Sequence, residues 1–211
     1  MMRNLLSLLG AFCFFSIPSL LAQYHLVVTE HATDIVPGQT TYRLYVEMVN
    51  TDDFLSSVYG NSNFPLELAS TTSFYNNPFG AAVASAINPL SITLVPEVAA
   101  DSWVSIGIEN SPVDGESDIS TVESDLQPWV PTMASGSDLD GDNLVIDDET
   151  GGAWFILNGA TNGLPDASNL VLIAQLTTDG ELSGTVNVQI FPNGIGGDQV
   201  FQTFTFSGIG T

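Results

Sequence analysis

The feature that most constrains the fold is a recurring period of two in the apolar side chains. Residues 42–49 alternate over eight positions, with Leu44 and Val46 on the apolar side, and residues 186–190 and 200–206 alternate in the same way. Successive side chains of a strand point to opposite faces of a sheet, so this pattern is typical of half-buried strands. The runs expected to form strands are 26–28, 42–49, 91–95, 103–108, 154–157, 170–177, 184–191 and 200–206.

Turn signals separate these runs, and helix signals are few. Asp179-Gly180 lies between two expected strands, which predicts a hairpin. Residues 80–87 fit either two helical turns or a loop, and residues 120–123 fit a capping box that would begin a short helix before Pro128. The sequence therefore predicts an all-β fold, a β-sandwich or jelly-roll-like single domain over residues 23–211.

Residues 1–22 have the pattern of a secretory signal peptide. Arg3 precedes a short apolar stretch that contains Cys13, and Ala22 offers a small residue at the expected cut. The apolar stretch is shorter than the roughly 20 residues that a membrane-spanning helix needs. We therefore expect a secreted, extracellular protein that is not stably inserted in a membrane and that keeps no cysteine after cleavage.

The net charge narrows the classes of partner. The chain has 24 acidic and two basic residues, a formal net charge of −22, and Arg43 is the only basic residue outside the leader. Phosphate binding needs clustered Lys and Arg, so nucleic acid is excluded as a partner. A carbohydrate or another surface polymer is still a candidate partner. The charge favours cations and a saline extracellular setting.

The acidic residues are concentrated in residues 110–152, which hold 11 of the 24. No strong strand pattern falls in this segment. Loops of this length are uncommon in a compact domain unless they have a function or are disordered. We expect a long acidic, loop-rich excursion between two halves of one sandwich.

Part of this excursion matches the spacing of a calcium-binding loop. Calcium takes six to eight oxygen ligands, and residues 138–149 resemble the twelve-residue loop of EF-hands and dockerins. Asn143 replaces the usual glycine at position 6, and the flanks lack helical patterns. The alternative is a solvated acidic turn. The candidate calcium ligands, at positions 1, 3, 5, 7 and 12, are Asp138, Asp140, Asp142, the Leu144 carbonyl and Glu149.

The chain offers few catalytic groups. Residues 23–211 contain no cysteine and no Gly-x-Ser-x-Gly motif, and the histidines, His25 and His31, lie together near one end. Two carboxylates suffice for glycoside hydrolysis, and Glu47 and Asp101 each border an apolar run. Because charged side chains usually stay in water, we expect both to be exposed rim acids and the protein to be non-catalytic.

Aromatic side chains raise the possibility of sugar stacking. Trp103 and Trp154 lie within expected strands and should be in the core, whereas Trp129, next to Pro128 in the acidic segment, is the candidate for an exposed ring. Residues 74–80 form an aromatic, amide-rich segment suited either to sugar contact or to a packed turn.

Three strings, residues 42–46, 101–107 and 175–180, resemble parts of β-rich modules in large secreted surface proteins of marine bacteria. The resemblance implies an extracellular structural or adhesive role and transfers no site residue. The leading hypothesis is a secreted, non-catalytic, calcium-stabilised β-sandwich module for surface attachment or extracellular matrix. The alternatives are a carbohydrate-binding module or carbohydrate-active enzyme, and an acidic binder of cations or minerals.

Overall fold

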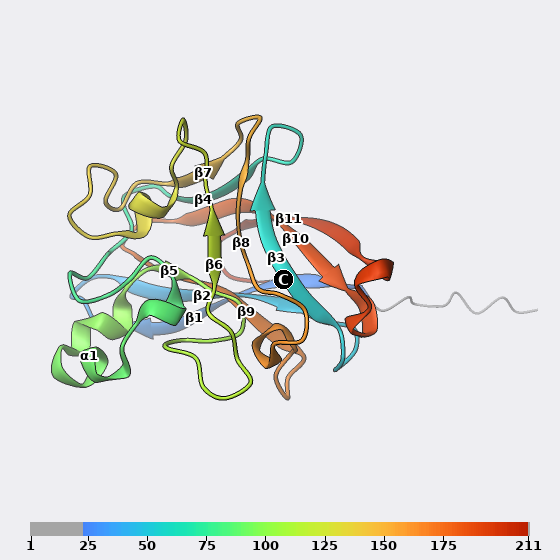
Figure 1. Cartoon of the computed structure of the whole chain (residues 1–211). Helices are drawn as coiled ribbons and strands as arrows, with labels where there is room; N and C mark the ends of the chain where they lie inside the picture. The colour runs from blue at the N-terminus through green and yellow to red at the C-terminus, as the bar shows by residue number, and fades with distance from the viewer. Residues whose placement is uncertain (1–22, 211) are drawn as a thin grey trace, which may run out of the picture.

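The computed structural model describes residues 23–210, so the predicted signal peptide lies outside the described residues. Figure 1 shows two layers of strands with short helices at their margins. No helix in the described part of the chain is long and apolar enough to cross a membrane. The strands are β1 (His25–Thr33), β2 (Thr40–Glu47), β3 (Phe54–Gly60), β4 (Leu66–Ser70), β5 (Trp103–Val104), β6 (Ser120–Val122), β7 (Leu144–Ile146), β8 (Gly152–Phe155), β9 (Leu170–Thr178), β10 (Leu182–Phe191) and β11 (Val200–Ser207).

The strands form two antiparallel sheets, which confirms the predicted all-β, sandwich-like fold. Sheet A has the order β1-β2-β9-β5. Sheet B has the order β6-β8-β3-β10-β4-β7, and β11 pairs with β10. The first part of β10 pairs with β4 and the second part with β3, while β11 runs along eight positions of β10. Sheet A is the lower layer in Figure 1 and sheet B the upper one.

The core lies between the sheets and is made by the alternating positions that the sequence marked as apolar. Leu44 and Val46 of β2 are fully buried, as are Val186 and Val188 of β10. Full burial of an aliphatic side chain of this kind stabilises a fold by about 1.5–3 kcal/mol. The opposite face of sheet A is more polar, and some of its side chains, such as Arg43 and Gln175, are buried as well.

The predicted strand at 91–95 is wrong. Residues Pro89–Leu94 form the short helix α1, because the Asn88 side chain accepts a hydrogen bond from the Leu90 N–H and Pro89 occupies the first helical turn. None of its residues is buried, so its apolar side chains carry no core pattern. Around α1 lie two 3-10 helices, Ala84–Ala86 and Pro96–Ala100.

Two other local predictions also differ from the structure. Only Trp103–Val104 of the expected strand 103–108 pairs as a strand. The capping-box segment forms β6 instead of a helix, since the Glu123 carboxylate accepts hydrogen bonds from the N–H groups of Trp129 and Val130 farther along the chain. The remaining 3-10 helices are Val130–Met133, Thr161–Gly163, Pro192–Gly194 and Gly196–Asp198.

The turn at Asp179-Gly180 does not close a hairpin. It connects β9 of sheet A to β10 of sheet B, so the chain changes layers at this point. Buried hydroxyl groups hold the crossing: Ser70 and Thr178 share a hydrogen bond of 2.6 Å, and the Thr178 hydroxyl accepts from the Gly180 N–H. The Asp-Gly pair therefore marks a turn, as expected, but it joins two sheets.

Candidate functional site

The outward face of sheet A carries the candidate site, and β2 provides its base. Arg43 and Tyr45 alternate with the core residues of β2 and so face away from sheet B. Arg43 is opposite Gln175 of β9, and a register shift after Leu44 brings Tyr45 opposite Leu172. The bulge thus places Gln175 and Leu172 on the same outer face although their numbers differ in parity.

The segment after β5 is folded back over this face. The Ser105 and Gly107 N–H groups donate to the carbonyls of Ile173 and Leu172 at 2.9 and 2.8 Å, so the chain follows β9. It then turns at Gly107, whose φ of +71° favours glycine. A side chain at Gly107 would also collide with the Asn162 carbonyl. The turn directs the following residues, including Glu109, across the outer face of sheet A.

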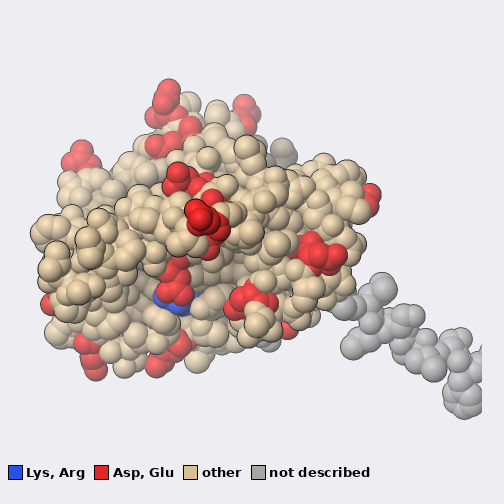
Figure 2. All heavy atoms as spheres, turned by 60° about the horizontal axis from the view of Figure 1, so that its bottom comes forward, with Lys and Arg blue, Asp and Glu red and all other residues tan. Residues whose placement is uncertain are grey.

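Arg43 and Glu109 form a two-fold hydrogen-bonded ion pair. Both terminal nitrogens of the guanidinium donate to the Glu109 carboxylate at 2.7 Å, and the Arg43 Nε donates to the Gln175 side-chain oxygen at 3.0 Å. Arg43 is 8% exposed, whereas the Glu109 side chain is 54% exposed. In Figure 2 the blue atoms lie in a hollow directly against acidic atoms. The ion pair therefore fixes the position of a carboxylate that solvent can reach.

Glu109 lines several cavities, and we call two of them together the Glu109 hollow. One, of about 170 Å³, lies beside Arg43, His31 and Trp103, and the other, of about 470 Å³, lies beside Tyr45. The larger cavity has a mixed lining. Its further lining residues include Glu116, Thr161, Asn162, Asp166, Leu170 and Leu172. Carboxylates and apolar groups thus share one surface depression.

Buried polar groups make the hollow rigid. The Asn162 side chain is 4% exposed and donates to the Ile106 carbonyl at 2.9 Å, while its oxygen accepts from the Ser117 N–H at 3.0 Å. Gln175 donates to the carbonyls of Ala99 and Asp101. Burial, with a contribution from the Arg43 charge, lowers the pKa of His31, although Glu109 opposes this shift. His31 is thereby favoured in its neutral form at neutral pH.

Asp101 lies behind the Glu109 hollow. It is buried, so the prediction that it is an exposed rim acid is wrong. It is 1% exposed, and its two carboxylate oxygens accept hydrogen bonds from the N–H groups of Asn77 and Ala81 at 2.6 and 2.8 Å. Burial raises the pKa of Asp101 to about 7 against the effect of these N–H donors, and the nearby Asp140 charge raises it further. Its carboxylate anchors residues 77–81, which makes it a structural group. Glu47, the other acid considered, is half-buried.

The candidate calcium ligands lie in the excursion, away from β2. Asp140 accepts hydrogen bonds from the Asn76 side chain at 2.8 Å and from the Gly136 N–H at 2.6 Å, and Leu144 pairs with Leu68 at the start of β7. In the calcium-loop pattern the sharp turn belongs at Asn143. In the structure the left-handed residue is Gly141, two residues earlier, with a φ of +79°. Asp138, Asp142 and Glu149 are exposed.

The structure does not bring these ligands together. Within residues 23–210, no group of three or more His, Cys, Asp or Glu side chains is placed to hold a metal ion. Asn76 is buried, and its side-chain oxygen has no hydrogen-bond partner among the described residues. Calcium binding by this segment stays a prediction.

The three tryptophans are all buried. Trp103 and Trp154 are 2% and 0% exposed, as expected, but Trp129 is also 0% exposed, so the prediction of an exposed Trp129 is wrong. The Trp129 indole donates to the Val122 carbonyl at 2.9 Å and packs against Trp154 with ring centroids 5.5 Å apart. No described tryptophan is therefore available for stacking on a sugar.

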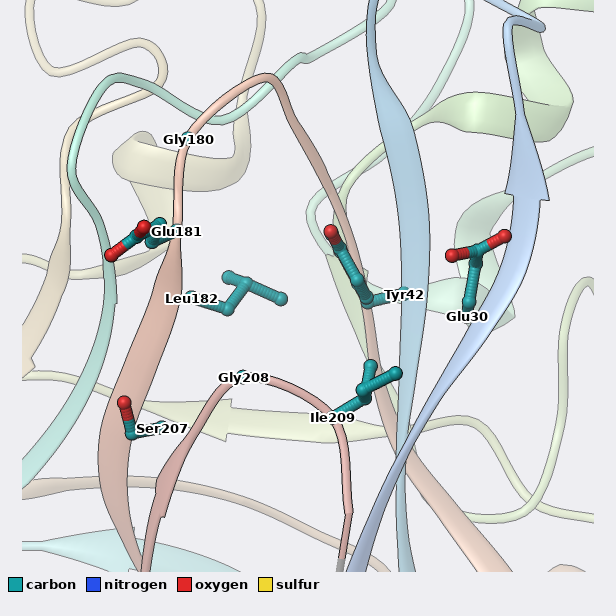
Figure 3. A pocket seen from close by; sticks show the side chains of 8 residues that line it. All are labelled: Glu30, Tyr42, Gly180, Glu181, Leu182, Ser207, Gly208 and Ile209. Atoms are coloured by element: carbon teal, nitrogen blue, oxygen red, sulfur yellow. The ribbon is translucent and has the colours of Figure 1, made fainter.

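A second hollow lies on the opposite side of β2, where the margins of the two sheets meet. This Tyr42 hollow, of about 350 Å³, is lined by Glu30, Tyr42, Glu181, Leu182 and the turn after β11. In Figure 3 Leu182 and Ile209 lie between the two carboxylates, and the Glu181 side chain points away from Leu182. Its polar side chains therefore do not converge.

No known protein family, curated protein or solved structure matches this chain. The assignment of function therefore rests on the site. The sequence showed that Arg43 and Tyr45 share one face, but it gave no sign of Glu109, which is 66 residues from Arg43. Gly107 indicates a turn in the sequence. The direction in which the chain then runs depends on the contact of Gly107 with Asn162.

Proposed function

We propose that this chain is a secreted, non-catalytic β-sandwich module that attaches to an extracellular surface polymer, and that the Glu109 hollow holds a neutral saccharide of that polymer. The observation that carries the proposal is the lining of the larger cavity, where Glu109, Glu116 and Asp166 surround an apolar floor that includes Tyr45 and Leu172. Binding sites for small ligands combine an apolar lining with a few placed polar groups, and they measure roughly 300–1,000 Å³.

The chemistry of the lining suits a sugar. Sugar hydroxyl groups donate hydrogen bonds, which carboxylates accept strongly, and the C–H faces of a sugar ring pack on aromatic and aliphatic surface. The hydrogen bonds of Arg43 and Asn162 hold the walls before a ligand arrives. A preformed site loses less conformational entropy on binding.

The charge of the lining selects against anionic polymers. Three carboxylates line the larger cavity, and the guanidinium of Arg43, the nearby cation, is already paired with Glu109. A uronate or sulfate group would meet uncompensated negative charge there. The expected ligands are therefore neutral sugars.

We propose a binding module and not an enzyme because the candidate acids are already held by hydrogen bonds within the protein. Glu109 is held by Arg43, and both oxygens of Asp101 accept main-chain hydrogen bonds. Neither carboxylate is arranged as a general acid or base that could exchange a proton with a bound sugar. The resemblance to surface-protein modules, the leader sequence and the net charge support an extracellular place of action.

Calcium is part of the proposal as a stabilising ion in the excursion. The unpartnered oxygen of Asn76 lies on the same amide group that bonds Asp140, and calcium favours both amide and carboxylate oxygens. Binding would draw Asp138 and Asp142 toward Asp140 and reduce their mutual repulsion.

The proposal is tested on a glycan array. The protein is applied to immobilised hexasaccharides of glucose, mannose and xylose, and to hexasaccharides of uronic acids, at 0.15 and 0.5 M NaCl. We expect retention on at least one neutral series at both salt concentrations. Retention on uronic acids alone, or on no saccharide while circular dichroism shows folded protein, would contradict the proposed function.

A further inference from the structure

The strand β11 at the margin of sheet B carries no charged side chain. Its eight residues, 200–207, are Val, Phe, Gln, Thr, Phe, Thr, Phe and Ser. β11 pairs in a ladder with β10, and within residues 23–210 no strand pairs with its other edge. Beyond Ser207 the chain turns, and Gly210 forms a single bridge with Val28 of β1.

A free strand edge presents unpaired main-chain N–H and C=O groups. Soluble proteins usually protect such an edge with charged side chains, proline or a bulge. β11 has none of these, and its register with β10 is regular from Val200 to Ser207. An unprotected edge of this length is a template for pairing with another strand.

Exposed aromatic side chains adjoin this edge. Phe201 of β11 is 54% exposed and packs edge-on against Tyr59 of β3, with ring centroids 5.8 Å apart. Tyr59 packs in turn against Phe64, which is 49% exposed, at 6.2 Å. The interplanar angles of 84° and 69° give no flat platform for a sugar ring. The aromatic cluster instead offers apolar surface to a protein partner.

We propose that β11 pairs antiparallel with β11 of a second copy of this chain, joining two copies of sheet B into one continuous sheet. A two-fold axis at Thr203 places Thr203 of the two copies opposite each other and sets Phe201 opposite Thr205. Pairs of threonines and of aromatic with β-branched residues stabilise antiparallel sheets. The closest acidic residue before the strand, Asp198, would then face Gly208, so no two carboxylates oppose each other.

The net charge explains why this strand is suited to a second copy. At a formal net charge of −22, two copies repel each other, and an approach through uncharged β11 keeps opposed carboxylates apart. Salt screens the remaining long-range repulsion. Self-association through β11 should therefore strengthen as the salt concentration rises, and the two-fold pairing closes at a dimer.

Sedimentation velocity of residues 23–211 at 0.05 and 1 M NaCl tests this pairing, because a monomer and a dimer of this chain separate well. We expect a monomer–dimer equilibrium that shifts toward dimer at high salt. The exposed substitution Thr203→Glu would place two like charges across the axis and should weaken dimerisation about tenfold or more. Thr150→Glu adds the same charge at an exposed position outside β11 and should dimerise like the unchanged protein.

Melting curves of both variants establish that they fold. A protein that stays monomeric at 1 M NaCl overturns the proposal, and so does equal dimerisation of Thr203→Glu and Thr150→Glu. Open-ended aggregates in place of a dimer also contradict it. This test is independent of the saccharide test, since the Glu109 hollow lies on sheet A.

Discussion

The two hollows that flank β2 share similar groups but differ in how these groups are held. The Glu109 hollow contains a carboxylate fixed by two hydrogen bonds from Arg43, and Arg43 is fixed in turn by Gln175. In the Tyr42 hollow, Glu30 lies on β1 and Glu181 in the turn before β10, and their side chains have no hydrogen-bonded partner among the described residues. A tyrosine and carboxylates are thus present in both, and only one hollow is pre-organised.

This difference shows where binding is expected in a chain so rich in acids. Carboxylates are everywhere on the surface, so their presence carries little information. A carboxylate whose position is set by a nearly buried cation is rare here, since Arg43 is the one basic residue between 23 and 211. If the network behind the Glu109 hollow is energetically important, changes in it should alter stability more than matched changes in the Tyr42 hollow.

The largest expected effect concerns Asp101, whose main-chain carbonyl accepts a hydrogen bond from Gln175. Its pKa of about 7 in the folded state lies above the ordinary value of 3.8. The folded protein therefore retains a proton that the unfolded chain loses between about pH 4 and pH 7. Over this window the free energy of unfolding should fall by about 4 kcal/mol as the pH rises.

Urea denaturation at pH 4 and pH 8 measures this dependence. Asp101→Asn should remove most of the decrease that the unchanged protein shows. Glu181→Gln, an exposed change in the Tyr42 hollow, should retain it. Equal pH dependence in the two variants would show that Asp101 does not titrate as its burial implies.

Calcium should give the next largest effect, and it acts next to the same network because the Asp140 charge raises the pKa of Asp101. Ion at 100 times its dissociation constant would add about 2.7 kcal/mol to the free energy of unfolding. This corresponds to a rise in Tm of roughly 5–10 °C. Melting curves with excess chelator and with millimolar calcium, at equal ionic strength, measure the shift.

Variants identify the segment responsible. Asp142→Ala should remove most of the calcium-dependent shift, and its exposed side chain makes it a better choice than Asp140, which already bonds Asn76 and Gly136. Asp125→Ala, an exposed change outside residues 138–149, should keep the shift. Superimposed curves with and without calcium would reduce the segment to a solvated acidic turn.

A smaller effect is expected when the ion pair is removed. Glu109→Gln leaves the nearly buried guanidinium of Arg43 without its counter-charge, which destabilises a protein. Because the Glu109 side chain is half exposed, solvent screens the pair and the expected loss is about 1 kcal/mol. Glu30→Gln in the Tyr42 hollow should change the free energy of unfolding by less than about 0.5 kcal/mol. Chemical denaturation of both variants compares them, and losses of equal size would remove the distinction between the hollows.

The fold could be predicted where the alternation was long. β2, β10 and β11 fall on runs of seven or more residues that contain the alternation, and β9 falls on a largely apolar run of eight that is buried on both faces. The segment 91–95 was missed because α1 buries none of its side chains, so its apolar residues follow no periodic pattern. Asn88 and Pro89 nonetheless form a sequence signal for the start of a helix.

Other features depend on contacts that a local pattern does not contain. The Asp-Gly turn specifies a reversal of the chain but not the sheet that the next strand joins. Trp129 has polar neighbours in sequence, yet its indole finds the Val122 carbonyl and the Trp154 ring. Glu109 meets Arg43 only because Gly107 turns the chain against Asn162. From the sequence, therefore, only the residues that β2 contributes to the site, Arg43 and Tyr45, could be predicted.

The measurement that tests the central claim most directly is a calorimetric titration of a neutral hexasaccharide retained on the array. Tyr45→Ala removes the aromatic floor of the Glu109 hollow and should weaken binding about tenfold, which is about 1.4 kcal/mol. Tyr42→Ala, a second half-buried tyrosine of β2, lines the other hollow and should bind like the unchanged protein. Unchanged affinity in Tyr45→Ala, or a loss confined to Tyr42→Ala, would contradict a saccharide site at the Glu109 hollow.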